Sequence, residues 1–253
     1  MIDASSARTM PQLPRVIGHR GAAAVAPENT LASLRRAKEL GAAWVEFDVK
    51  LTRDGAAVLM HDERLGRTTD GRGEVARIAL AELQKLDAGA WFDPSFAGER
   101  VPTLADALAL CGALGLGINV EIKPCPGREA ETARVAVETL LELWPEGRPA
   151  PLISSFAPVC LAVARDLAPA MPRGYLAGCL PALWQEQLET YGCSTLHLND
   201  RRTSERQRAA VLTAGVPLVL YTVNDPRRAR ELLERGVAAL FTDRVGEVLA
   251  ALN

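Results

Sequence analysis

Eight strand-like segments, each followed by a helix-like segment, alternate along almost the whole chain. The strand-like segments are short apolar runs or runs with a period of two, and the helix-like segments repeat apolar residues every three to four positions. The expected strands are 15–19, 44–49, 117–122, 152–156, 173–176, 195–198, 218–223 and 239–242, and the expected helices are 31–40, 104–114, 129–143, 158–167, 182–190, 204–214, 226–234 and 245–252. Eight such pairs in 253 residues are typical of an α/β protein with a closed (β/α)8 TIM barrel.

The main alternative to a barrel is an open, doubly wound α/β sheet. The first strand-to-helix turn lacks the G-x-G-x-x-G pattern of dinucleotide-binding sheets, and polar residues recur at many strand ends, which an open sheet would not require. No Gly/Ser-rich linker or internal repeat divides the chain, and 48% of its residues are hydrophobic, enough for one large core. We therefore expect a single barrel domain over residues 1–253.

Charge and composition exclude several classes of partner. A net charge of −2 gives no broad basic field, which argues against nucleic acid, so any anion must bind a local site. Residues 1–14 have neither a cationic start nor an apolar run, and no segment reaches the roughly 18 apolar residues of a membrane span. The five cysteines are odd in number and form no C-x-x-C pair. We expect a soluble, cytoplasmic protein with reduced cysteines and no stable membrane association, and the oligomeric state stays open.

The first two expected strands carry polar side chains to one end of the barrel. The first ends in His19-Arg20-Gly21, which places a proton-transfer group and a fixed cation at its carboxyl end. Asn29 or Thr30 can cap the helix that follows. In the second strand the period of two sends Glu46 and Asp48 to the same side, together with Trp44, which favours the barrel interior.

A further strand over 56–60 interrupts the alternation. It follows the turn-forming sequence Leu51-Thr-Arg-Asp-Gly55, and a connection this short can join only antiparallel strands. With the turn centred near residues 53–54, His61 returns beside Glu46. Residues 62–101 then form an insertion after the second barrel strand, which we expect to shape the site.

The third barrel strand completes the predicted constellation. Its period of two sends Glu121 and Lys123 to the mouth of the barrel, opposite Glu46 and Asp48. Three converging carboxylates repel one another unless a cation joins them, and donors that are all oxygen favour Mg²⁺ or Ca²⁺. Arg20 and Lys123 beside one divalent cation describe a receptor for a phosphate.

The ordered set of motifs resembles the glycerophosphodiester phosphodiesterases. The matching pieces are His19-Arg-Gly, Pro27-Glu-Asn-Thr30, Glu46-Phe-Asp48, Leu51-Thr-Arg-Asp-Gly55, His61-Asp62, Arg67-Thr-Thr-Asp-Gly71, Ala88-Gly-Ala-Trp-Phe92, Pro102-Thr-Leu104, Glu121-Ile-Lys123, Ser155-Phe156, Tyr221-Thr-Val-Asn224 and Phe241-Thr-Asp243. Each is weak alone, but the set spans almost the whole chain after Arg15. Tyr221 is a departure, because the family often has Trp there.

The resemblance implies a TIM-barrel hydrolase, a phosphoric diester hydrolase that uses a divalent metal to convert small glycerophosphodiesters to sn-glycerol 3-phosphate and an alcohol. It implies that Glu46, Asp48 and Glu121 bind the metal and that His19 and His61 are an acid/base pair. Arg20 and Lys123 would contact the phosphate, and Phe156 and Tyr221 at strand ends are candidates for the wall of a glycerol pocket. The alternatives are a related barrel phospholipase or phosphodiesterase and a non-catalytic glycerophosphodiester-binding protein.

Three sets of residues are interpreted as structural and not as part of the catalytic set. Glu28 and Asn29 are helix-start residues that could also support the metal ligands. The segment Arg67-Thr-Thr-Asp-Gly71 is interpreted as a structured turn, and His197 as a packed strand residue outside the catalytic set.

Overall fold

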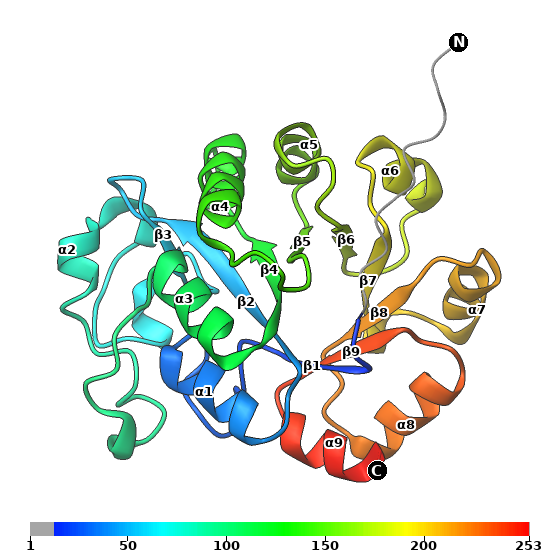
Figure 1. Ribbon diagram of the computed structural model, residues 1–253, viewed down its shortest axis with the longest axis horizontal. Coiled ribbons are helices and arrows are strands. Elements are labelled where there is room, and N and C mark those ends of the chain that lie inside the picture. The colour runs from blue at the N-terminus through cyan, green and yellow to red at the C-terminus, as the bar shows by residue number, and fades with distance from the viewer. Residues whose placement is uncertain (1–12, 253) are drawn as a thin grey trace.

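Eight parallel strands close into a barrel at the centre of the molecule, and helices surround it (Figure 1). The structure is a computed structural model, and it describes residues 13–252. Each strand pairs with its neighbours in parallel, and pairing of the first strand with both the second and the last closes the ring. The barrel strands are β1 (Val16–Gly18), β2 (Trp44–Leu51), β4 (Gly117–Ile122), β5 (Leu152–Ser155), β6 (Arg173–Ala177), β7 (Thr195–Asn199), β8 (Leu218–Tyr221) and β9 (Ala239–Thr242). The expected TIM barrel is therefore confirmed.

The helices lie outside the strands and cover the apolar outer face of the barrel (Figure 1). They are α1 (Leu31–Glu39), α3 (Leu104–Leu114), α4 (Glu129–Leu143), α5 (Pro158–Leu167), α6 (Trp184–Thr190), α7 (Glu205–Thr213), α8 (Pro226–Glu234) and α9 (Val245–Leu252). All expected strands and helices are present, with ends that differ by at most two residues. No helix in residues 13–252 is long and apolar enough to cross a membrane.

The alternation of side chains along the strands builds the site. In β2, Val45, Phe47 and Val49 point outward into the core beneath the helices. The opposite face of the strands fills the barrel with an apolar layer that includes Trp44, Leu152 and Phe241. Closer to the carboxyl ends of the strands, the same inward face carries polar residues. The polar site therefore lies next to the apolar layer that fills the barrel.

The antiparallel strand β3 (Ala57–Leu59) pairs with the end of β2, as expected, but in a different register. The ladder joins Val49 to Leu59 and Leu51 to Ala57, one residue away from the register that would set His61 beside Glu46. The reason is a loop one residue longer, closed by Thr52 N donating to Ala56 O, with Gly55 at φ 82°. His61 still returns to the mouth of the barrel.

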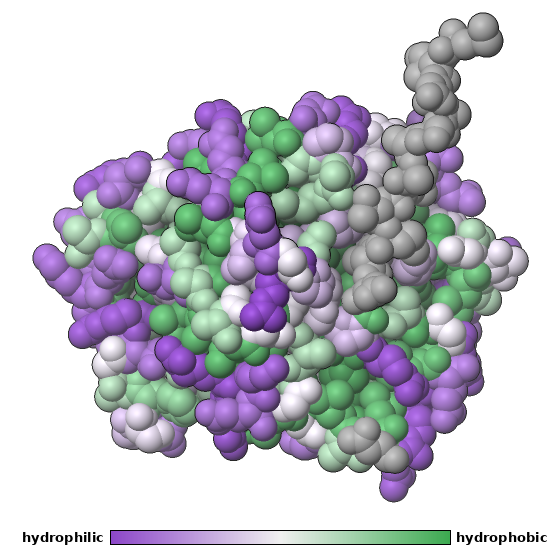
Figure 2. Space-filling model, viewed as in Figure 1, coloured by the Kyte–Doolittle hydropathy of each residue, from purple (hydrophilic) through white to green (hydrophobic). Residues whose placement is uncertain are grey.

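The insertion between β3 and α3 forms a lobe beside the barrel, around α2 (Leu80–Leu83) (Figure 1). Three short 3-10 turns accompany this helix: η1 (Leu65–Arg67), η2 (Val75–Arg77) and η3 (Pro94–Phe96). The lobe has its own buried apolar cluster, with Val58, Leu65, Val75 and Leu83 at its centre. Its outer surface is largely hydrophilic, as the left side of Figure 2 shows.

The barrel and its insertion account for residues 13–252 of the domain expected over 1–253, and residues 1–12 and Asn253 lie outside the described part. The remaining 3-10 turn is η4 (Asp200–Arg202). Cys111, Cys125, Cys160 and Cys179 are free thiols, as expected, and Cys179 is the exposed one among the cysteines of residues 13–252.

Candidate active site

Three buried carboxylates meet at the carboxyl ends of β2 and β4. One oxygen each from Glu46, Asp48 and Glu121 lies within 4.8 Å of the others. The register explains the meeting, because Asp48 is paired directly with Glu121 across the two parallel strands and Glu46 lies one pleat below on the same face. The structure thus brings together the three residues that the sequence proposed as metal ligands.

The ionisation of this cluster is strongly perturbed. Burial, with the neighbouring charges of Asp48 and Glu121, raises the pKa of Glu46 well above its usual value. Burial and Asp48 raise the pKa of Glu121 to about 7. Burial tends to raise the pKa of Asp48, but the positive charges of Lys123 and Arg20 have the larger combined effect, so the pKa is lowered. The three groups therefore do not ionise together at neutral pH without another cation.

Unpartnered oxygen atoms indicate where such a cation fits. Glu46 Oε1 and Glu121 Oε1 are buried and accept no hydrogen bond from residues 13–252. Lys123 Nζ is 3.3 Å from Glu121 Oε1, but without hydrogen-bond geometry. Buried oxygens left in this way are costly unless something binds them, and an all-oxygen set suits a hard divalent ion. The residues therefore fit a metal ion.

Two cations flank the carboxylates, as the sequence predicted. Arg20 Nε lies 3.4 Å from Asp48 Oδ2, and Lys123 Nζ lies 3.4 Å from Asp48 Oδ1. Arg20 Nε makes no hydrogen bond within the described chain, so this donor is available to a ligand. Lys50, which the sequence analysis did not select, donates from Nζ to Lys123 O at 2.9 Å and holds the end of β4.

The loop after β1 explains how Arg20 is placed. Arg20 and Asn29 have φ values of 52° and 57°, a left-handed conformation that is unfavourable for side chains other than Gly. Gly21 has φ 86°, and a Cβ there would lie 2.4 Å from Ser33 Oγ. Asn29 in turn binds Asp48, donating from Nδ2 to Oδ2 at 2.8 Å, while Thr30 caps α1. This concentration of backbone strain is characteristic of functional sites.

His19 is fixed through one ring nitrogen. Its Nδ1 lies 2.6 Å from Asp243 Oδ1, and Asn224 Nδ2 donates to the other oxygen of Asp243 at 2.7 Å. The ring N–H therefore points to Asp243, and Nε2 faces the carboxylate cluster, 3.9 Å from Glu46 Oε2. Asp243 and Asn224 end two of the motifs that resemble the family, but neither was assigned a role from the sequence, although both follow strands at the same end of the barrel.

His61 has a comparable arrangement. Its Nδ1 lies 2.6 Å from Asp62 Oδ1, and Arg67 Nε donates to Asp62 Oδ2 at 2.5 Å. The hydrogen bond from Arg67 lowers the pKa of Asp62 to about 2, so this carboxylate is ionised at neutral pH. Burial lowers the pKa of His61, although nearby Asp48 opposes the shift. A neutral imidazole with a fixed tautomer results, with Nε2 available for proton transfer.

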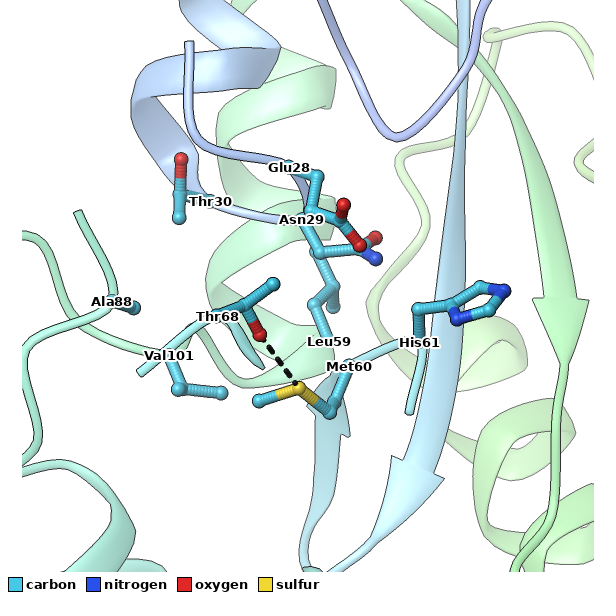
Figure 3. A pocket seen from close by; sticks show the side chains of 9 residues that line it. All are labelled: Glu28, Asn29, Thr30, Leu59, Met60, His61, Thr68, Ala88 and Val101. Carbon is cyan, nitrogen blue, oxygen red and sulfur yellow. Dashed lines mark hydrogen bonds between the residues drawn. The ribbon is translucent and has the colours of Figure 1, made fainter. Parts of the chain in front are cut away.

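Glu28 connects this group with Arg20. Arg20 Nη1 and Arg67 Nη2 each donate to Glu28 Oε1 at 2.7 Å. In Figure 3 the polar ends of Glu28 and Asn29 point toward the side where the His61 ring projects, while Met60 and Thr68 pack beneath them. Arg67, interpreted from sequence as part of a turn, thus contributes to the site. The sequence signal for Arg67 was its place at the start of the motif Arg67-Thr-Thr-Asp-Gly71, which resembles the family.

The two aromatic candidates stand together on the far side of the mouth. The rings of Phe156 and Tyr221 meet edge to face at 6.1 Å between centroids, at the ends of β5 and β8. Tyr221 donates its hydroxyl to Ala177 O at 2.9 Å, and 44% of Phe156 is exposed. His197 lies apart from this site. It is fully buried, 2.9 Å from Thr195 Oγ1, and its pKa is lowered by burial to about 3.

Comparisons with known proteins agree with this arrangement. Residues 19–247 match the model of the glycerophosphoryl diester phosphodiesterase family. A glycerophosphodiester phosphodiesterase of Caldanaerobacter subterraneus subsp. tengcongensis is 36% identical over 90% of this chain and 93% of its own. One from Bacillus subtilis is 31% identical over 90% of this chain and 82% of its own.

A solved structure is also closely similar. The Oleispira antarctica phosphodiesterase, in complex with the product sn-glycerol-3-phosphate, superposes with a TM-score of 0.92 at 41% identity. The match covers 95% of this chain and 97% of that one.

Proposed function

The chain belongs to the glycerophosphoryl diester phosphodiesterase family, and we propose that it hydrolyses glycerophosphodiesters to sn-glycerol 3-phosphate and an alcohol. The observation that carries this proposal is the buried carboxylate cluster with unpartnered oxygens, flanked by two cations and two histidines. The bound sn-glycerol-3-phosphate of the Oleispira antarctica enzyme supports the same product class.

Glu46, Asp48 and Glu121 would hold one divalent cation, Mg²⁺ or Ca²⁺, which when bound supplies positive charge to the phosphate. Arg20 and Lys123 bind the non-bridging phosphate oxygens and stabilise the charge that develops on them during hydrolysis. The Nε–H of Arg20 supports this role, because it is a buried donor that makes no hydrogen bond within residues 13–252.

His19 and His61 move the protons. Each holds its Nδ1 against a carboxylate, so Nε2 is the atom that accepts a proton from the nucleophile or gives one to the leaving oxygen. We assign the acid to His61, because it adjoins the insertion and hence the side from which the variable alcohol leaves. The nucleophile is either water or the substrate's own 2-hydroxyl, which would close a cyclic phosphate.

Phe156 and Tyr221 form the opposite wall, and we assign the glycerol to it. The Tyr221 hydroxyl is already committed to Ala177 O, so the ring offers mainly an apolar surface to the carbon skeleton. We place the enzyme in the cytoplasm, acting on small molecules for glycerol and lipid metabolism.

A coupled assay for released glycerol 3-phosphate tests the proposal. Glycerophosphocholine and glycerophosphoethanolamine are incubated with the protein and Mg²⁺ or Ca²⁺. Turnover supports an enzyme, whereas stoichiometric binding without release would indicate a glycerophosphodiester-binding protein. Release only from intact phospholipids in vesicles would favour the related phospholipase instead.

A further inference from the structure

A second, strongly basic cavity opens on the insertion beside the proposed active site. It measures about 410 Å³ and is lined by Asp62, Arg64, Gly66, Arg67, Arg72 and Gly73. Three guanidinium groups therefore face a single carboxylate, and that carboxylate is already bound by Arg67. The remaining two cations, Arg64 and Arg72, give the cavity its net positive charge.

Arg64 and Arg72 belong to the two segments of a short antiparallel pair, in which Arg64 lies opposite Glu74 and Arg72 precedes Glu74 by two residues. Leu65 N donates to Gly73 O at 3.0 Å, and Val75 N donates to Glu63 O at 2.9 Å, which joins the two segments as a short antiparallel pair. Gly73, at φ 100°, permits the turn between them. The placement of the two arginines is thus fixed by main-chain hydrogen bonds.

Neither arginine has a protein acceptor. Both side chains are exposed, and within residues 13–252 neither makes a side-chain hydrogen bond or ion pair. Among the acidic residues near them in the chain, Glu63 does not line the cavity, Glu74 pairs with Arg77 at 3.0 Å, and Asp70 accepts a hydrogen bond from Asp87 N. Two forked donors are therefore available to an external anion.

Two residues that line the cavity, Arg67 and Asp62, also contact residues of the proposed active site. Arg67, on one wall, shares the Glu28 Oε1 atom with Arg20, the proposed phosphate contact. Asp62, which accepts hydrogen bonds from Arg67, also contacts His61, the proposed general acid. A leaving alcohol that extends from the phosphate past His61 would enter this cavity.

We propose that Arg64 and Arg72 bind an anionic group carried by the leaving alcohol, a phosphate or a carboxylate, so that the enzyme prefers glycerophosphodiesters of anionic alcohols. This inference rests on the proposed function and refines its substrate class. The aromatic rings of the insertion do not contribute to this cavity, because Phe92 contacts Trp91 and Phe96 edge to face and none of the three lines it. In this proposal the enzyme therefore selects the leaving alcohol by its charge.

The test compares two substrates that differ by one phosphate, glycerophosphoinositol and glycerophosphoinositol 4-phosphate. In both, one water is consumed: its oxygen bonds to phosphorus, the ester bond to the inositol oxygen breaks, and that oxygen takes up a proton. We expect kcat/KM of the metal-loaded enzyme to favour the phosphorylated substrate by about five- to tenfold at low ionic strength, the scale of two exposed ion pairs. Added salt should reduce the preference.

The double variant Arg64→Gln/Arg72→Gln should bring the preference close to one. Its matched control is Arg35→Gln/Arg206→Gln, which removes two exposed arginines from α1 and α7 and changes the net charge equally. Loss of preference in this control would show that the overall field of the protein is responsible and would overturn the inference. Matched assays with a carboxylate-bearing alcohol, glycerophosphoserine against glycerophosphoethanolamine, identify which anion is preferred.

The two levels of the proposal fail separately. If glycerophosphocholine is hydrolysed but the wild-type enzyme does not favour the phosphorylated inositol ester, or cleaves neither inositol ester, the cavity does not select anionic alcohols. If no glycerophosphodiester is hydrolysed with metal present, the proposed function itself is wrong.

Discussion

The guanidinium of Arg67 binds the carboxylate of Glu28 through two hydrogen bonds, each 2.7 Å long. This contact fastens the insertion to the loop that carries Arg20. Because Glu28 also accepts from Arg20 and Arg67 also donates to Asp62, one ion pair helps to orient the proposed phosphate contact and a histidine at the same time. Arg67 is a positioning residue, since its guanidinium acts through these partners.

Replacement of Arg67 by Gln should therefore impair binding and turnover together. We expect KM for glycerophosphocholine to rise and kcat to fall, by about tenfold each, because Arg20 and His61 both lose a support. Arg67→Lys should recover only part of the loss, since an ammonium cannot reproduce the two-point contact. Arg77→Gln, which removes an exposed ion pair with Glu74, is the control. A change in KM alone would limit the role of Arg67 to Arg20.

The sequence predicted the barrel and the carboxylate cluster because both depend on periodic patterns. A period of two places Glu46 and Asp48 on one face, and the common carboxyl end of parallel strands brings Glu121 to them. The hairpin register was wrong by one residue, because the number of residues in a turn is not periodic and Gly55 accommodates one more than expected.

The residues that hold the two histidines in place could not be predicted from such periodic patterns. Asp243 is 224 positions from His19, and Arg67 is 39 positions from Glu28, so no local pattern joins these partners. Their contacts depend on loop conformations that only the closed barrel determines. Asp62, adjacent to His61, was the one support within local reach.

Metal affinity should depend on pH. In the metal-free protein burial and Asp48 raise the pKa of Glu121 to about 7, so below that pH the cation must displace a proton. We expect affinity for Mg²⁺ or Ca²⁺ to fall as pH drops from 8 to 5.5, approaching about tenfold per pH unit, with proton release measurable by calorimetry in buffers of different ionisation enthalpy. Affinity that is constant over this range would contradict a shared proton and metal site.

Substitution of the ligands should separate binding from folding. Glu46→Gln and Glu121→Gln should lose metal affinity and activity while the circular dichroism spectrum is retained, and Glu142→Gln on the exposed face of α4 should behave as wild type. Chelation should abolish activity, and Mg²⁺, Ca²⁺ or Mn²⁺ should restore it. Full activity in excess EDTA would remove the metal from the mechanism.

The third histidine should affect stability in acid. Burial lowers the pKa of His197 to about 3 in the folded state, against about 6.5 when unfolded, so the folded protein holds it neutral. Between these values the unfolded state binds the extra proton, and stability falls as pH decreases, by about 1.4 kcal/mol per pH unit from this group. Above about pH 6.5 the contribution is constant.

His197→Gln should remove that component. Denaturant unfolding from pH 7 to 4.5 should give a smaller decline in the free energy of unfolding for the variant than for the wild type, whatever its stability at pH 7. Activity on glycerophosphocholine at pH 7 provides the control for a folded site. Parallel pH profiles for the two proteins would show that folding does not lower the pKa of His197.

The two histidines of the site should be distinguishable by the leaving group. Each general acid or base step is worth about 10²–10⁴-fold, so His19→Ala and His61→Ala should each lower kcat on glycerophosphocholine by at least that order, with metal affinity retained. A p-nitrophenyl ester departs without needing a proton. The variant that lacks the acid should therefore recover much of its rate on such an ester, and the variant that lacks the base should not.

We expect the recovery in His61→Ala, because Asp62 and Arg67 hold His61 beside the insertion, where we propose that the alcohol leaves. Asp243→Asn provides a further check on His19: the substitution weakens the hold on Nδ1, so it should lower kcat less than His19→Ala does and show no rescue by the activated ester. Recovery by His19→Ala instead would exchange the two roles. If neither variant recovers, the histidines do not divide acid and base between them, since loss of the acid alone must be compensated by a leaving group that needs no proton.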